Sequence, residues 1–326
     1  LMLGRLVDAG KLRWDTPVTE VFPGFRLGND DTTRRVRIEH LVCACTGLPR
    51  QDFEWLMEFE DATAASTLKT LATMQPTSDF GALFQYSNPL ASAGGYVGAH
   101  LLYPEMELGA AYDRAMQEQV FGPLGMEHTT FDIAQALAGN HAEPHAWDMD
   151  GRMRMASMDF NYSIRPVRPA GGAWSNVHDM LRYVQMELDR GLAHDGKRIV
   201  SEAVIDERRK AKVAYGNDAV YGMGLETDRT WGIPVVNHGG SMIGFKSNMI
   251  WLPEHGVGAV ILTNADEGGA MLGPFQRRLL ELLFDGKPEA AERITTGAAN
   301  SRKGLATERD TLVLPADPAA VAALAP

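Results

Sequence analysis

Two β-rich runs in the last third of the chain constrain its fold more than any other sequence feature. They cover Phe245 to Leu252 and Val257 to Thr263, and only Pro253-Glu254-His255-Gly256 separates them. Two such runs joined by so short a turn predict an antiparallel hairpin. A third β-rich run, from Trp231 to Asn237, precedes the pair. We therefore expect antiparallel strands throughout this region.

Helical patterns surround these strands. Helices are expected at the start of the chain, over 64–74, over 90–102 and after Ser175 or Asn176, either of which can cap the helix that follows. The final helix has one apolar stripe, formed by Leu272, Phe275, Leu279, Leu282 and Leu283. Helices first, then antiparallel strands, then a packing helix is an α+β order, unlike the alternating rhythm of a doubly wound sheet.

The charge balance bears on the class of partner. Among 326 residues, 31 are basic and 42 acidic, which gives a net charge of −11, and 45% are hydrophobic. Proteins that track phosphates concentrate Lys and Arg, so this balance argues against a nucleic-acid partner. No apolar run approaches the roughly 20 residues that cross a bilayer. The composition favours an enzyme with a large core and a small-molecule substrate.

Residues that often bind metals or form disulfides favour structural roles here. Cys43 and Cys45 are so close in sequence that disulfide geometry is rarely met, so we expect two small packing residues. His141 and His145 have the spacing of helical zinc ligands, but Pro144 between them prevents that helix. The sequence predicts neither a metal nor another cofactor.

The first candidate site is Tyr86-Ser87-Asn88, on a predicted turn with Pro89. A Tyr and an Asn two residues apart on a turn can project to one side. The phenol can then accept or return a proton if nearby cations lower its pKa. The amide can donate to a substrate carbonyl and accept from a neighbour. Tyr86 is therefore a candidate catalytic residue, and Asn88 a candidate substrate-binding residue.

The second candidate site is His238-Gly239-Gly240-Ser241, at the end of a β-rich run. Glycines there let a substrate backbone approach the strand, and a strand N–H beyond them can contribute to an oxyanion hole. The competing interpretation is a simple turn with an exposed His. The nucleophile elbow of α/β-hydrolases does not fit, because Ile243 stands where its last Gly belongs. The candidates are His238 for catalysis, with Gly239, Gly240 and Ser241 for substrate binding.

In this order, the two sites resemble motifs of the serine β-lactamase and penicillin-binding-protein family, which includes class C β-lactamases, D-aminopeptidases and family VIII carboxylesterases. That family carries Ser-x-x-Lys, then Tyr-x-Asn, then Lys- or His-x-Gly on a strand. Further similarity extends from Leu1 to about Leu283. It includes Leu6 to Leu12, Asp15 to Val18, His40 to Pro49, Pro123 to Met126, Gly171 to Ser175, Tyr221 to Gly224 and Leu262 to Asn264.

The resemblance implies a β-lactamase/transpeptidase-like fold, in which helices flank an antiparallel sheet beside a helical subdomain. It also implies acyl transfer on an ester, amide or β-lactam, with proton handling by Tyr86 and an oxyanion held in part by the Ser241 N–H. Many relatives carry Lys where this chain has His238. A His is only partly charged near neutrality, which favours an esterase or peptidase-like hydrolase over a dedicated β-lactamase.

By the family's spacing, Ser-x-x-Lys would precede Leu1. We therefore expect a fragment, inactive alone, that lacks its nucleophile and N-terminal strands, with 257–263 at an unpaired sheet edge. One alternative is a non-catalytic ligand-binding protein that kept the pocket and lost the nucleophile. Another uses Ser66 of the literal Ser66-Thr67-Leu68-Lys69, where the family has an ordinary surface helix.

We expect three parts in the chain: a helical subdomain over 1–167, a sheet-and-helix part over 168–286, and a linker over 287–326 that is rich in Ala, Pro and charge. Within the linker, the segment from Leu312 to Ala319 resembles the lead-in to a small C-terminal β domain. The N-terminus shows no signal peptide, and neither localisation nor oligomeric state can be read from the sequence.

Overall fold

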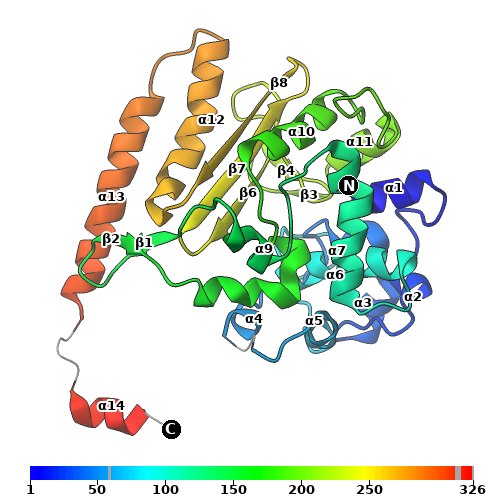
Figure 1. Cartoon of the computed structure of the whole chain (residues 1–326), viewed down its shortest axis with the longest axis horizontal. Coiled ribbons are helices and arrows are strands. Elements are labelled where there is room, and N and C mark those ends of the chain that lie inside the picture. The colour runs from blue at the N-terminus through cyan, green and yellow to red at the C-terminus, as the bar shows by residue number, and fades with distance from the viewer. Residues whose placement is uncertain (58–59, 313–316, 325–326) are drawn as a thin grey trace. The chain divides into compact units, whose positions relative to one another are not determined.

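The computed structural model describes residues 1–57, 60–312 and 317–324. Helices come first along the chain, strands later and long helices last, which confirms the predicted α+β class (Figure 1). The helices and helical turns are α1 (Met2–Asp8), α2 (Val18–Val21), α3 (Asp30–Arg35), η1 (Ile38–Leu41), α4 (Phe53–Met57), α5 (Ala64–Leu71), α6 (Asn88–Leu102), α7 (Leu108–Met116), η2 (Gln117–Phe121), α8 (Gly122–Leu124), α9 (Ile133–Ala138), η3 (Asp159–Ala170), α10 (Val177–Leu188), α11 (Glu202–Arg209), η4 (Asp266–Gly268), α12 (Gly269–Leu283), α13 (Ala290–Asp310) and α14 (Pro318–Leu324). The strands are β1 (His145–Trp147), β2 (Met153–Met155), β3 (Val213–Ala214), β4 (Ala219–Tyr221), β5 (Glu226–Asp228), β6 (Val235–Met242), β7 (Phe245–Leu252) and β8 (Val257–Thr263).

The chain forms two compact units, which do not follow the expected three-part division; that division stays a prediction. The first unit comprises Leu1–His141, Met158–Gly240 and Ser247–Leu262. The second comprises Ala142–Ser157, Ser241–Lys246 and the described residues of Thr263–Pro326.

The main sheet has the order β3-β4-β5-β6-β7-β8, and a separate hairpin pairs β1 with β2. The predicted hairpin is confirmed, with strands that span the expected residues and a turn in which Gly256 has a φ of 64°. β8 is the last strand in the sheet order, as expected for 257–263. The third strand, β6, begins at Val235 rather than Trp231 and continues to Met242. The His-Gly-Gly-Ser segment therefore lies within a strand rather than after one.

Helix α10 packs on the sheet inside the first unit. Asn176 caps it, since its side chain accepts a hydrogen bond from the Asp179 N–H at 2.9 Å. The helix contributes Val184 to an apolar cluster with Leu225, which immediately precedes β5, and with Val236 on β6 and Trp251 on β7. Helix and strand approach closely at Gly258, where a Cβ atom would lie 2.3 Å from a Val184 methyl group. A glycine is required there by packing.

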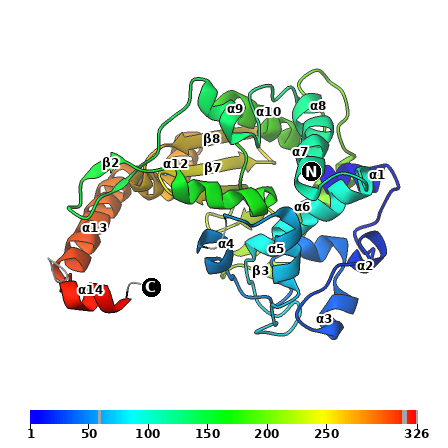
Figure 2. The same cartoon turned by 60° about the horizontal axis from the view of Figure 1, so that its bottom comes forward.

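Helix α6 is the centre of the helical part of the first unit, and it packs against α1, α5, α7, η1 and η3 (Figure 2). Its glycines permit this crowding. A Cβ on Gly98 would lie 2.7 Å from the Met2 side chain, and one on Gly95 would lie 2.5 Å from Pro169 and 2.7 Å from the Tyr112 ring. The small-residue composition of this helix is therefore what lets so many elements surround it.

We expect Gly95→Ala to lower the free energy of unfolding by about 1–3 kcal/mol, because the new methyl group overlaps Pro169 and Tyr112. Urea unfolding followed by circular dichroism measures the change. Gly24→Ala is the matched control, because its Cβ would lie 3.5 Å from the Phe22 ring, an ordinary contact. Equal stability of the two variants would contradict close packing around α6.

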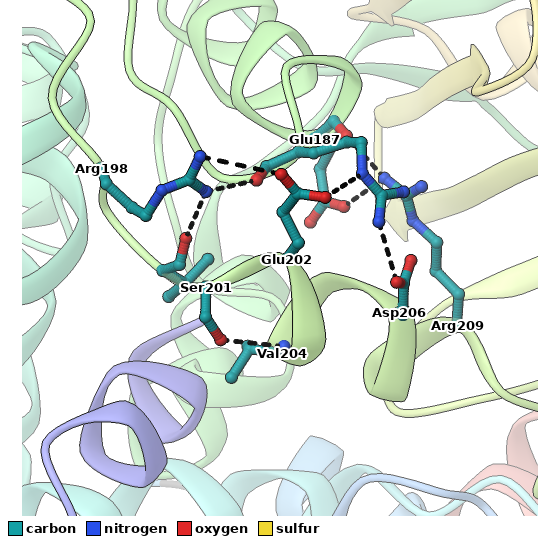
Figure 3. Close-up of polar contacts among 9 residues, drawn as sticks. Glu187, Arg198, Ser201, Glu202, Val204, Asp206 and Arg209 are labelled. Atoms are coloured by element: carbon teal, nitrogen blue, oxygen red, sulfur yellow. Dashed lines mark hydrogen bonds and ion pairs between the residues drawn. The ribbon is translucent and has the colours of Figure 1, made fainter.

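A buried ion cluster connects α10 to α11. Figure 3 shows two of its members, Glu187 and Arg209. The Glu187 side chain is fully buried and pairs with Arg208 and, at 2.9 Å, with Arg209. Arg208 also donates to the Tyr183 hydroxyl at 2.7 Å. Burial alone would raise the pKa of Glu187, but the charges of Arg208 and Arg209 outweigh it and hold that pKa below 4.5. The carboxylate thus stays ionised inside the protein.

Glu187→Gln should lower the free energy of unfolding by about 3–5 kcal/mol, because it leaves buried guanidinium charge without its partner. The lowered pKa of Glu187 also has a pH signature. Its stabilisation is complete above the unfolded pKa near 4.5 and falls as the pH drops through the folded value. Chemical unfolding between pH 3 and pH 7 should therefore show a shallower acid dependence in the variant. Glu202→Gln serves as the control, since that side chain is 54% exposed in its pair with Arg190 and contributes about 0–1 kcal/mol.

Within 287–326, the segment that the sequence analysis expects to be a linker, Ala290–Asp310 forms the 21-residue helix α13 beside α12. The first turn of α13 is capped by a side chain from another helix. A carboxylate oxygen of Glu281, on α12, accepts from the N–H groups of Glu289 at 2.8 Å and Ala290 at 3.0 Å. Burial would raise the pKa of Glu281, but these N–H groups and Arg277 lower it to about 2. A cap from a neighbouring helix leaves no local sequence signal. Of the expected β-domain lead-in, residues 313–316 lie outside the described residues.

Candidate active site

Tyr86 lies immediately before α6. The expected turn at 86–89 is instead the start of this helix, because Ser87 is its N-cap and accepts from the Leu90 N–H, while Pro89 takes an early position that needs no N–H donor. Tyr86 and Asn88 are half-buried on either side of the buried Ser87. The crowded helix α6 thus fixes where both candidate side chains begin.

Asn88 is held by Asp52 from the loop before α4. Its amide nitrogen donates to Asp52 at 2.9 Å, and the same carboxylate oxygen accepts from the Trp55 indole N–H at 2.9 Å. Arg50 pairs with the other oxygen of Asp52, and its guanidinium lies 5.5 Å from the centre of the Tyr86 ring. The loop therefore orients the Asn88 amide and brings a cation to the phenol.

His238 lies half-buried on β6, and Gly239 and Gly240 beside it are exposed. A Cβ at Gly240 would lie 2.5 Å from the Ser247 hydroxyl on β7, so the neighbouring strand alone accounts for a glycine at this position. Gly239 is less confined, because a Cβ at this position would lie 3.3 Å from the Ser247 carbonyl oxygen.

The structure brings Tyr86 and His238 together, with Tyr221 beside both. The ring centres of Tyr86 and His238 are 6.3 Å apart, and each lies 6.1–6.3 Å from the Tyr221 ring. The Tyr221 hydroxyl is 3.1 Å from His238 Nε2. Two segments separated by about 150 residues in sequence, as Tyr86 and His238 are, thus meet in one polar cluster.

Burial keeps these groups neutral. It raises the pKa of Tyr86 above 10.0, with the Arg50 charge opposing and the Asp52 and Glu226 charges adding to the rise. Burial likewise raises the pKa of Tyr221 well above 10.0. It lowers the pKa of His238 below 6.5, although the hydrogen bond to the Gly239 carbonyl opposes this. At pH 7 the cluster therefore holds two phenols and a neutral imidazole.

Comparison with known proteins identifies the family of this chain. The model of the family described as beta-lactamase matches residues 1–282. The chain belongs to the beta-lactamase family. Penicillin-binding protein 4 of Amycolatopsis lactamdurans is 28% identical over 285 residues, which cover 86% of this chain and 72% of that protein. An unguisins hydrolase of Aspergillus campestris is 23% identical, over 81% of this chain and 50% of its own length.

Solved structures of the beta-lactamase family share the fold. The octameric penicillin-binding protein homologue from Pyrococcus abyssi has a TM-score of 0.73 at 22% identity, over 88% of this chain and 64% of that one. D-Amino acid amidase from Ochrobactrum anthropi SV3 has a TM-score of 0.65 at 20% identity, over 92% of this chain and 81% of that one. The chain therefore spans about half to four fifths of the proteins it resembles.

The remaining serines of the sequence analysis have separate positions. Ser66 lies in the first turn of α5, where its hydroxyl completes the capping box with the N-cap residue Thr63: it accepts from the Thr63 N–H at 2.7 Å and donates to the Thr63 carbonyl at 2.8 Å. Lys69 of the same literal motif is exposed. Ser241 is exposed toward the end of β6 and belongs to the second compact unit.

Among the described residues, no helix is long and apolar enough to cross a bilayer. In the same residues, no three His, Cys, Asp or Glu side chains gather as they would around a metal.

Sequence reasoning missed four residues around this beta-lactamase-family site. They are Arg50, Asp52, Tyr221 and Glu226. Tyr221 opens the Tyr-Gly-Met-Gly match and Arg50 follows the Gly-Leu-Pro match, so the motifs marked both segments without indicating a role. Asp52 and Glu226 carry no motif, and only the fold places their charges near Tyr86.

The expectation of two free packing cysteines is wrong, because Cys43 and Cys45 form a disulfide. Ala44 between them has a φ of 51°, a left-handed conformation that opens the turn and sets the two Cα atoms 5.2 Å apart. The disulfide belongs to an apolar cluster with Tyr221, against which Tyr86 packs. It therefore supports the aromatic side of the site.

Alkylation tests the disulfide directly. In protein purified without reductant and then unfolded, iodoacetamide should modify no cysteine, whereas reduction before alkylation should add two modifications by mass spectrometry. Cys45→Ser is the control, because its single thiol should react with or without reductant. Two modifications in the unreduced wild-type protein would contradict the pairing.

Proposed function

We propose that this chain is part of a serine hydrolase that transfers acyl groups from an ester, amide or peptide-like substrate. In this proposal Tyr86 and His238 are catalytic. The substrate is oriented by Asn88 and lies along Gly239, Gly240 and Ser241, whose N–H contributes to the oxyanion hole. The reaction needs no metal or other cofactor, because phenol, imidazole and strand N–H groups supply proton transfer and charge stabilisation.

The observation that carries the proposal is the neutral His238 beside Tyr86. A lysine at this position would present a fixed cation to the carboxylate of a β-lactam. The imidazole has a pKa lowered by burial and carries little charge at pH 7, so it attracts such a carboxylate weakly. This favours a substrate without an obligatory carboxylate. The amidase and hydrolase named among the relatives are consistent with that substrate class.

The nucleophile in this proposal comes from a Ser-x-x-Lys segment other than Ser66 to Lys69, which is the one literal match within residues 1–326. The hydroxyls of two serines within 1–326 already serve helix starts: Ser87 accepts from the Leu90 N–H as the N-cap of α6, and Ser66 completes the capping box of α5 with Thr63. We propose that 1–326 alone is inactive and that the longer protein is the enzyme.

Restoring the upstream coding sequence tests this directly. The extended protein should hydrolyse p-nitrophenyl butyrate and react with a fluorophosphonate probe, whereas 1–326 should do neither. In the extended protein, Tyr86→Phe should reduce kcat by about 10²–10⁴-fold, because the phenol no longer handles the proton.

Ser66→Ala is the control and should leave hydrolysis unchanged, since its hydroxyl serves α5. Probe labelling of 1–326 that disappears in Ser66→Ala would overturn the assignment of the nucleophile. An extended protein with no Ser-x-x-Lys that still binds acyl analogues would instead identify a ligand-binding protein.

A further inference from the structure

The Asp52 side chain accepts three hydrogen bonds beside the candidate active site. One of its carboxylate oxygens accepts from Asn88 Nδ2 and from the Trp55 indole N–H, each at 2.9 Å, and the other oxygen accepts from Arg50. The side chain of Asp52 is only 17% exposed. The carboxylate is therefore an acceptor held in one place, and one of its three donors is the candidate substrate-binding residue Asn88.

These contacts decide which end of the Asn88 amide is left for a substrate. A carboxylate paired with Arg50 can only accept hydrogen bonds, so Asn88 must turn its N–H group, and not its carbonyl oxygen, toward Asp52. Nδ2 and Oδ1 diverge from one carbon atom, so Oδ1 is turned away from Asp52. Within residues 1–57, 60–312 and 317–324, nothing donates a hydrogen bond to that oxygen.

We propose that Asp52 is a specificity-determining residue, because it makes Asn88 an acceptor for an N–H group of the substrate. From the sequence, the amide could equally donate to a substrate carbonyl and accept from a neighbour. In the structure, Asp52 takes one N–H of the amide, while both lone pairs of Oδ1 stay unused. The favoured substrate then carries an N–H close to its reacting acyl group, as an N-acylamino acid ester or a peptide does. This inference rests on the proposed function.

Trp55 keeps the arrangement from reversing. Its indole N–H can only donate, so the atom that it contacts at position 52 must remain an acceptor. Trp55 lies on α4, which packs against η3. An asparagine at position 52 would therefore keep its oxygen toward Trp55 and still accept from Asn88. An alanine at the same position would release the Asn88 amide.

Binding to 1–326 tests the acceptor without any hydrolysis. The probes are ethyl N-acetylglycinate and ethyl levulinate, which differ only by an N–H in place of a CH₂ group. Titrations can follow the Asn88 side-chain amide resonance in ¹H–¹⁵N spectra, with Asn88→Ala to assign it. We expect a Kd about 3–10-fold lower for the N-acetylglycinate, the effect of one hydrogen bond. Equal affinities, or no binding of either probe, would overturn the proposal.

Variants of Asp52 test its part in this selection. In Asp52→Ala the two Kd values should become equal within about 2-fold, and the Trp55 indole resonance should shift, because both N–H groups have lost their acceptor. Asp52→Asn should retain the wild-type preference. Glu54→Gln is the matched control, since that carboxylate accepts from Gln51 at 2.9 Å, and it should leave both affinities unchanged. A merely structural role for Asp52 would weaken both probes alike and preserve the preference in Asp52→Ala.

Kinetics in the extended protein separate this inference from the proposed function. The p-nitrophenyl esters of N-acetylglycine, levulinic acid and pentanoic acid offer, in turn, an N–H with a carbonyl, a carbonyl alone, and neither group. We expect kcat/KM to be about 3–10-fold higher for the first than for the other two, which should be alike. If the levulinate matched the N-acetylglycinate, Asn88 would be a donor and the proposal would be wrong. Hydrolysis of none of the three would contradict the proposed function and leave the binding titrations to decide the role of Asp52.

Discussion

Close packing around α6 is the constraint on which the rest of the first unit depends. Gly95 and Gly98 let Pro169, Tyr112 and the Met2 side chain approach the helix backbone, at positions where even a methyl group would overlap them. A helix enclosed on so many sides has little freedom to shift. Its first turn follows Tyr86 directly, so the same packing that stabilises the helical part also fixes the phenol and the Asn88 amide. Stability and site geometry therefore have one physical source.

The electrostatic character of the site follows from burial more than from formal charge. The cluster of Tyr86, Tyr221 and His238 is neutral because charged forms of buried groups are disfavoured. Arg50 and Glu226 act on this cluster in opposite directions. Membership of the beta-lactamase family places this cluster in the fold of that family.

The sequence predicted features that depend on neighbouring residues better than features that depend on residues far apart in the chain. The hairpin of β7 and β8 and the Asn176 cap of α10 were predicted because strand alternation, turn residues and capping act between near neighbours. Helix α13 was taken for a linker, because its start is capped by Glu281 from another helix. The disulfide of Cys43 and Cys45 was missed as well, since it depends on a left-handed backbone at Ala44 that no residue type announces.

The sequence by itself determined the class of fold, the family and the identity of Tyr86, Asn88 and His238 as candidate residues, because motif order and spacing are written along the chain. Only the tertiary structure decided that Tyr221 lies beside both the phenol of Tyr86 and the imidazole of His238. Those relations depend on distances between side chains on different elements. Such distances arise when packed helices and paired strands fix the backbone, so no local pattern in the sequence can specify them.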